Sequence, residues 1–137
     1  MTEQPKILKA QCLCGGLQFE VKDAFKYAFY CHCSLCRKRT GSAFASIAGI
    51  DIENLKVSHG TLLKEGESHD GYRALCGTCF TPLFSVLMGR QRMHVNLGVL
   101  CDEPSCKPNH HIYVGSKASW HTITDDLPQF TELPYSA

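Results

Sequence analysis

The stretch Cys31-His-Cys-Ser-Leu-Cys36 places three thiols within six consecutive residues. Two cysteine pairs lie elsewhere in the chain, Cys12-Leu-Cys14 before two glycines and Cys76-Gly-Thr-Cys79. Thiolates at these spacings can converge on one ion, and groups of thiolates from distant parts of a small chain are typical of Zn²⁺ sites. We therefore expect zinc to tie separate segments of this chain together.

These seven thiols exceed the four ligands that one tetrahedral zinc takes. The two pairs together make a closed Cys₄ site, whose role is stability because it has no position for an outside molecule. The triplet offers three thiolates and one open position, at which an external thiol would lose its proton. We predict two zinc ions per chain, a structural one on Cys12, Cys14, Cys76 and Cys79 and an open one on Cys31, Cys33 and Cys36.

The composition is that of an ordinary globular protein, with 44% hydrophobic and 20% charged residues among 137. This length fits a single domain over residues 1–137. The net charge of +1 creates no field that would attract nucleic acid or an anionic membrane. No stretch has the length of a transmembrane helix, and the first ten residues lack the apolar core of a signal peptide. We expect a cytoplasmic protein that binds neither nucleic acid nor a membrane. The sequence specifies no oligomeric state.

A reducing compartment also favours metal ligation over disulfides. Residues two apart are poorly placed for a disulfide of normal geometry, and nine cysteines leave at least one unpaired. A disulfide framework is therefore the weaker interpretation.

Short segments with a period of two predict a mostly β fold of small antiparallel sheets. Apolar residues alternate with polar ones in Leu17–Lys22 and in Arg92–Leu97. Further strand candidates are Phe44–Ile50, Gly71–Leu75, Leu83–Leu87 and His111–Val114. Only Ser34–Thr40 indicates a helical turn, with Ser34 as the expected N-cap.

The three cysteine motifs, in this order, resemble those of the glutathione-dependent formaldehyde-activating enzyme (GFA) family. The likeness covers about residues 11–130 and rests on Cys12-Leu-Cys-Gly-Gly16, Cys31-His-Cys-Ser-Leu-Cys-Arg-Lys-Arg-Thr-Gly41, Cys76-Gly-Thr-Cys79, His111-Ile-Tyr-Val114, Trp120 and Thr124-Asp-Asp-Leu-Pro-Gln-Phe130. The resemblance implies an Mss4-like fold held by zinc, with the same division of the cysteines into a structural and an open site. It also implies a carbon–sulfur lyase that condenses formaldehyde with glutathione to S-(hydroxymethyl)glutathione.

Several side chains near the triplet are candidates for roles in such a reaction. Arg37 and Arg39 could receive substrate carboxylates, although a solvated turn explains them equally well. Thr40 and Ser42 are weak candidates for moving a proton. His32 is expected to face away from the metal, because alternate residues of an extended segment point apart; a ligand role is the alternative.

Other residues leave alternatives open. Phe80 follows Cys79, the last cysteine of the Cys76-Gly-Thr-Cys79 turn (the knuckle turn). The family pattern usually has a glycine at this position, which can adopt a positive φ. Cys101 and Cys106, with His110 and His111, could form a third metal site or supply a fourth ligand to the triplet, but a Pro-flanked loop is the simpler account. Trp120 and Phe44 are expected in the core. The competing function is a non-catalytic, zinc-stabilised module that binds a protein or glutathione.

Overall fold

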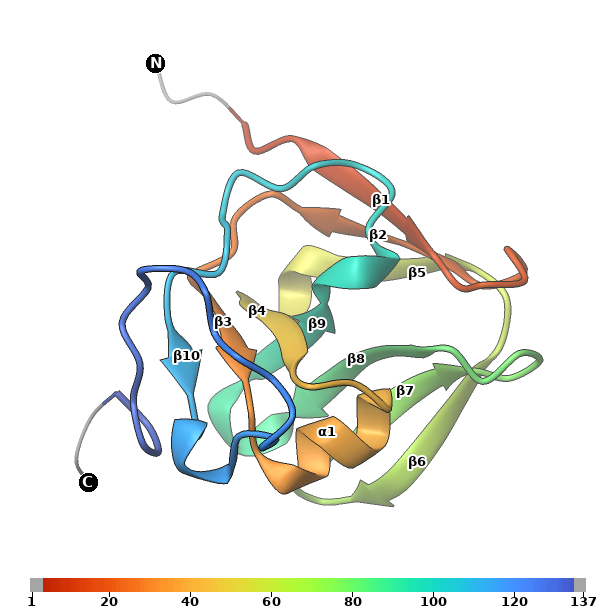
Figure 1. Cartoon of the computed structure of the whole chain (residues 1–137). Coiled ribbons are helices and arrows are strands. Elements are labelled where there is room, and N and C mark those ends of the chain that lie inside the picture. The colour runs from red at the N-terminus through yellow and green to blue at the C-terminus, as the bar shows by residue number, and fades with distance from the viewer. Residues whose placement is uncertain (1–3, 135–137) are drawn as a thin grey trace.

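The structure is a computed structural model, and it describes residues 4–134. Within that range the strands form two sheets (Figure 1). The smaller sheet has three strands in the order β1-β2-β5, namely β1 (Ile7–Gln11), β2 (Gln18–Lys22) and β5 (Leu55–His59). The larger has seven in the order β10-β3-β4-β9-β8-β7-β6. These are β3 (Tyr27–Cys31), β4 (Ala45–Asp51), β6 (Leu62–Ser68), β7 (Gly71–Cys76), β8 (Pro82–Leu87), β9 (Arg92–Asn96) and β10 (His111–Ile112).

The predicted mostly β fold with antiparallel sheets is confirmed. All pairings of the named strands are antiparallel except the one between β10 and β3, which is parallel. Among residues 4–134, helical structure is confined to short pieces, which are α1 (Ser34–Thr40) and the 3₁₀ turns η1 (Ile52–Asn54), η2 (Met88–Arg90), η3 (Leu97–Val99) and η4 (Val114–Ser116). No helix in the described part of the chain is long and apolar enough to cross a membrane.

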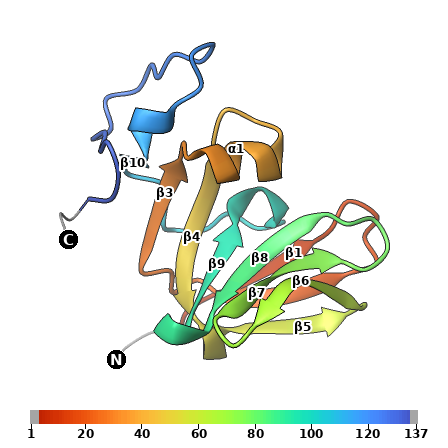
Figure 2. The same cartoon turned by 90° about the horizontal axis from the view of Figure 1, so that it is seen from below.

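The main core lies between the small sheet and one face of the large sheet. The period of two puts Phe19 and Val21 of β2 inward, and the opposing sheet supplies residues such as Phe84 and Val95. The rings of Phe19 and Phe84 meet edge to face, with their centroids 5.3 Å apart. Figure 2 shows the small sheet lying along β6, β7 and β8. The small sheet does not cover the other face of the large sheet, which we call the free face. A smaller hydrophobic cluster of Phe29, Cys31 and Ile112 lies there.

The helix forms where Ser34–Thr40 predicted it, but its N-cap is Cys33 and not Ser34. The Cys33 sulfur takes the cap position because it accepts a hydrogen bond from the backbone N–H of Cys36 at 3.3 Å. Gly41 ends the helix with a φ of 65°, in the left-handed region that glycine adopts at least cost. Two cysteines of the triplet, Cys33 and Cys36, therefore lie in the first turn of the helix and its cap.

Two sequence expectations about hydrophobic residues differ from the structure. Trp120 is not a core residue, since 71% of its surface is exposed. The strand predicted over His111–Val114 ends at Ile112, because Tyr113 has a left-handed φ of 56° and starts the turn η4. Phe44 is partly buried, in contact with the rings of Tyr30, His32 and His121.

Candidate functional site

The first cysteine cluster joins the loop after β1 to the loop between β7 and β8. The sulfurs of Cys12, Cys14, Cys76 and Cys79 all lie within 4.8 Å of one another. The Sγ–Sγ distance is 3.4 Å between Cys12 and Cys14 and 3.9 Å between Cys14 and Cys76. A tetrahedron with 2.3 Å Zn–S bonds has sulfurs about 3.8 Å apart, so the four thiols fit a zinc ion.

Hydrogen-bond donors around the cluster favour the thiolate form that a metal requires. The N–H of Leu17 donates to the Cys12 sulfur at 3.3 Å, and the N–H of Gly16 to the Cys14 sulfur at 3.4 Å. At Cys14 the Gly16 N–H acts to lower the pKa, but hydrogen bonds with the Cys12 and Cys79 sulfurs outweigh it and raise that pKa to about 11. The Thr81 hydroxyl lies 3.0 Å from the Cys79 sulfur and is the main cause that lowers the pKa of Cys79 to about 5. Donors around a thiolate stabilise its negative charge.

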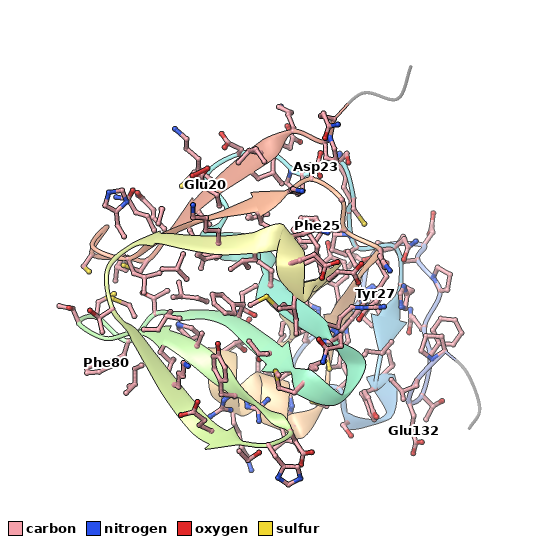
Figure 3. The ribbon with its side chains drawn as sticks, turned by 180° about the vertical axis from the view of Figure 1, so that it is seen from behind. Glu20, Asp23, Phe25, Tyr27, Phe80 and Glu132 are labelled. Carbon is pink, nitrogen blue, oxygen red and sulfur yellow. The ribbon has the colours of Figure 1, made fainter. Side chains whose placement is uncertain are left out.

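Phe80 adopts the conformation that the family's glycine would have, with a φ of 63°. Its backbone N–H donates to the Cys76 carbonyl at 3.0 Å, which closes the turn around the cluster. The ring does not compensate for the strain by packing, since 59% of the residue is exposed (Figure 3). The knuckle turn therefore keeps its geometry despite the phenylalanine.

The second cluster lies at the end of β3 and the start of α1. The sulfurs of Cys31, Cys33 and Cys36 lie within 4.8 Å of one another, and among residues 4–134 no fourth Cys, His, Asp or Glu atom joins the group. A hydrogen bond from the Cys36 thiol is the largest cause that lowers the pKa of Cys31 to about 6, and the charge of Arg39 contributes. The same contact raises the pKa of Cys36. Three converging thiols with one easily ionised member fit a metal with an open position.

The buried imidazoles of His32 and His111 form a hydrogen-bonded chain that begins between Cys31 and Cys33 of the triplet. His32 turns away from the sulfurs, is fully buried, and places its Nε2 2.8 Å from Nδ1 of His111. Nε2 of His111 lies 3.0 Å from Oδ1 of Asp125. A carboxylate only accepts, so Nε2 of His111 donates, and in the neutral ring its Nδ1 then accepts from His32. Nδ1 of His32 is left as an acceptor with no hydrogen-bond partner.

Sequence reasoning missed this network because 79 residues separate His32 from His111. The available signal was the position of the three residues, each inside a motif of the resemblance. Burial is the main cause that lowers the pKa of His32 to about 4. Burial also acts to raise the pKa of Asp125, but hydrogen bonds from the Leu127 N–H and from His111 outweigh it and lower that pKa.

The free face of the large sheet is hollowed beside the triplet. The hollow has a volume of about 170 Å³, with Cys36, Arg39 and Thr40 of α1 on one side. The opposite wall comes from β6 to β9 and includes Glu65, Arg73, Phe84, Ser85 and Asn96. Of the two predicted substrate-binding arginines, the structure brings only Arg39 to this hollow; Arg37 is not among its lining residues.

The remaining candidates lie at distinct places. The Thr40 hydroxyl lines the hollow but donates to the Cys36 carbonyl at 2.8 Å, and it accepts from the N–H of the exposed Ser42. Cys101 and Cys106 belong to neither cluster. The Cys101 N–H donates to the carbonyl of Lys9 in β1. Burial is the larger cause that raises the pKa of Cys106, and the charge of Asp23 raises it further.

The fold and the two thiol clusters define the class: a β protein with two candidate metal centres, one closed and one open. A family model described as glutathione-dependent formaldehyde-activating enzyme matches residues 7–116, and the chain belongs to this family. The family predicted from the motifs is thus confirmed.

Two individual proteins are similar to this chain. A Halomonas elongata protein named "Putative glutathione-dependent formaldehyde-activating enzyme" is 30% identical over 86 residues, or 57% of this chain and 55% of that protein. The chain thus spans about half the length of this curated relative. A crystal structure of a Rhodobacter sphaeroides protein matches with a TM-score of 0.54 and 27% identity, covering 71% of this chain and 91% of that one.

Proposed function

We propose that this protein is a zinc-dependent carbon–sulfur lyase that acts on the adduct of glutathione, or a closely related thiol, with a small aldehyde such as formaldehyde. The observation that carries the proposal is the three-thiol cluster of Cys31, Cys33 and Cys36, which lacks a fourth protein ligand among the described residues and borders a hollow. Membership of the GFA family supports the thiol and the aldehyde as reactants.

In the synthetic direction, the substrate thiol gives up its proton to solvent, its sulfur attacks the carbonyl carbon and a C–S bond forms. The carbonyl π electrons move to the oxygen, which takes one proton to give the hydroxymethyl thioether. A Zn²⁺ ion on the three thiolates would favour the ionised form of the substrate thiol at neutral pH. The chain itself holds the thiol over the hollow beside Arg39 and positions it for attack. Thr40, Ser42 or a water are the proposed sources of the proton.

We propose a second Zn²⁺ on Cys12, Cys14, Cys76 and Cys79, where four thiolates leave no open position. Its contribution is stability, for which structural zinc in small peptides supplies about 10–16 kcal/mol of apparent binding free energy. The proposal also places the 137 residues in a single cytoplasmic domain, with Arg39, which lines the hollow, as a substrate-binding residue.

Cobalt substitution tests the open site, because the visible spectrum of Co²⁺ reports its ligands. Glutathione should perturb the spectrum of the cobalt-loaded protein, whereas S-methylglutathione, which cannot ionise at sulfur, should do so far less. The effect should disappear in the Cys36→Ser variant. If no thiol changes the spectrum while both sites hold metal, the second site is closed, and a non-catalytic binding module becomes the better description.

A further inference from the structure

The free face of the large sheet carries a row of residues that oppose one another directly. The antiparallel register pairs His94 of β9 with Ser85 of β8, Ser85 with Arg73 of β7, and Arg73 with Glu65 of β6. Directly opposed residues in an antiparallel pair share a face. The row therefore runs across four neighbouring strands, whose order is visible in Figure 1.

Two adjoining hollows share this row. The one beside Cys36 and a second of about 340 Å³ over β6, β7 and β8 are both lined by Arg39, Glu65, Arg73 and Ser85. Together they form a trough that begins at the open thiol cluster and ends over Gly66 and Asp70. A ligand whose sulfur lies at the triplet would extend over the charged residues of the row.

The trough carries charges of both signs, and they gather where its two hollows meet, at Arg39, Glu65 and Arg73. Arg73 forms an ion pair with Glu65 through Nη2 and Oε1. Arg39 reaches the same place from α1, and among residues 4–134 no carboxylate lies within ion-pair distance of it. Two guanidinium groups would receive a carboxylate through paired N–H donors, and Glu65 beside them would receive an ammonium.

We propose that this trough is a subsite for an α-amino-acid zwitterion. Arg39 and Arg73 bind its carboxylate and Glu65 binds its ammonium. This inference rests on the proposed function in one respect, the identity of the ligand: glutathione carries such a zwitterion at its γ-glutamyl end, whereas its glycine end has only a carboxylate. The γ-glutamyl end therefore lies over β7 and β8, and the sulfur lies at the triplet.

Glutathione and glutaryl-cysteinylglycine, the analogue without the α-amino group, form a matched pair of ligands for the zinc-loaded protein. Glu65→Gln should weaken glutathione about tenfold in calorimetric titration and leave the analogue unchanged, because only glutathione has the ammonium. Arg39→Gln and Arg73→Gln should weaken both ligands by about tenfold. The control variants Glu67→Gln and Lys64→Gln lie on the same strand outside the trough and should change neither affinity.

The outcomes separate this inference from the proposed function. Equal weakening of both ligands by Glu65→Gln, or no weakening by any variant, would overturn the subsite even if glutathione still perturbs the cobalt spectrum. S-methylglutathione keeps the zwitterion, so its affinity should show the same dependence on Glu65. If it does while no thiol perturbs the cobalt spectrum, the subsite stands and the lyase function fails. An unchanged cobalt spectrum of each variant without ligand shows that it is folded.

Discussion

Phe80 shows at the scale of a single residue how the metal ligands dictate backbone conformation. The resemblance to the GFA family predicts a positive φ there, because the family pattern usually has a glycine at this position, and the structure has it at 63°. A non-glycine residue in this region costs about 1–2 kcal/mol. The cost persists because Cys76 and Cys79 are brought to one point on either side of the turn.

Replacing Phe80 by glycine should therefore stabilise the protein. We expect Phe80→Gly to raise the free energy of unfolding by about 1 kcal/mol, less the backbone entropy that glycine adds to the unfolded chain. Urea unfolding of the zinc-loaded protein measures the change. Phe80→Ala is the control, since it removes the exposed ring but keeps the Cβ and the strain. An equal gain in both variants would attribute the effect to the ring.

At the scale of elements, the imidazole chain links the end of β3 to β10 and to the segment that contains Asp125. These three parts of the chain meet only through tertiary contacts, which include the parallel pairing of β3 with β10. The loss of Asp125 removes the only carboxylate bonded to His111 among the described residues. The imidazole chain thus ties the segment around Asp125 to β10 and to His32, whose ring also lies 6.3 Å from that of His121.

Asp125→Ala should loosen this segment without unfolding the sheets. We expect roughly tenfold faster amide hydrogen exchange around residues 111–130, because hydrogen bonds to a charged group hold it in place. Exchange in β7 and β8 should not change. The matched control is Asp126→Ala, which removes the neighbouring exposed carboxylate. A uniform increase across the whole chain in Asp125→Ala would indicate global destabilisation instead.

The buried His32 should also make stability depend on pH. Burial is the main cause that lowers its pKa from 6.5 to about 4 in the folded protein. As the pH falls below 6.5, the unfolded chain therefore takes up a proton at His32 that the folded chain takes up only near pH 4. The stabilisation is complete above pH 6.5 and is lost as the pH falls towards 4. His32→Gln removes this titration and keeps the thiols. The free energy of unfolding should fall less steeply between pH 6.5 and 4 in the variant than in the unaltered protein; parallel slopes would exclude His32 as the cause.

At the scale of the whole molecule, the sequence was most informative where one face of a strand is buried. The alternation in β2 and β9 follows from a core on one side and solvent or a hollow on the other. Four strands were not predicted. β3 buries Ala28, Phe29 and Cys31 and so does not alternate, while β6 is an edge strand exposed at nearly every position. β1 and β5 were likewise not predicted.

The candidate site divides in the same way. Spacing within each cysteine motif is local, while the ligand count and the family resemblance assign the two distant pairs to one site; the structure brings the thiols of both predicted groups together. Arg73 and Glu65 could not be placed beside Cys36, because their position depends on strand register and on how the helix lies over the sheet. His32 and His111 lie in separate motifs of the resemblance, 79 positions apart, and neither motif predicts that the two rings meet.

The two clusters should differ in what their loss does to the whole molecule. Cys79→Ser breaks the site that joins the β1 loop to the β7–β8 loop, and the circular dichroism of the β fold should be lost or its thermal unfolding should move to much lower temperature. Cys36→Ser affects a cluster on the free face, outside the main core, so a folded protein should remain with one zinc instead of two. Native mass spectrometry counts the ions.

Cys101→Ser is the control and should keep both zinc ions, since Cys101 belongs to neither cluster. Equal unfolding of the Cys79 and Cys36 variants would contradict the division into a structural and an open site, and one ion in the unaltered protein, or iron instead of zinc, would contradict the pairing of the ligands itself.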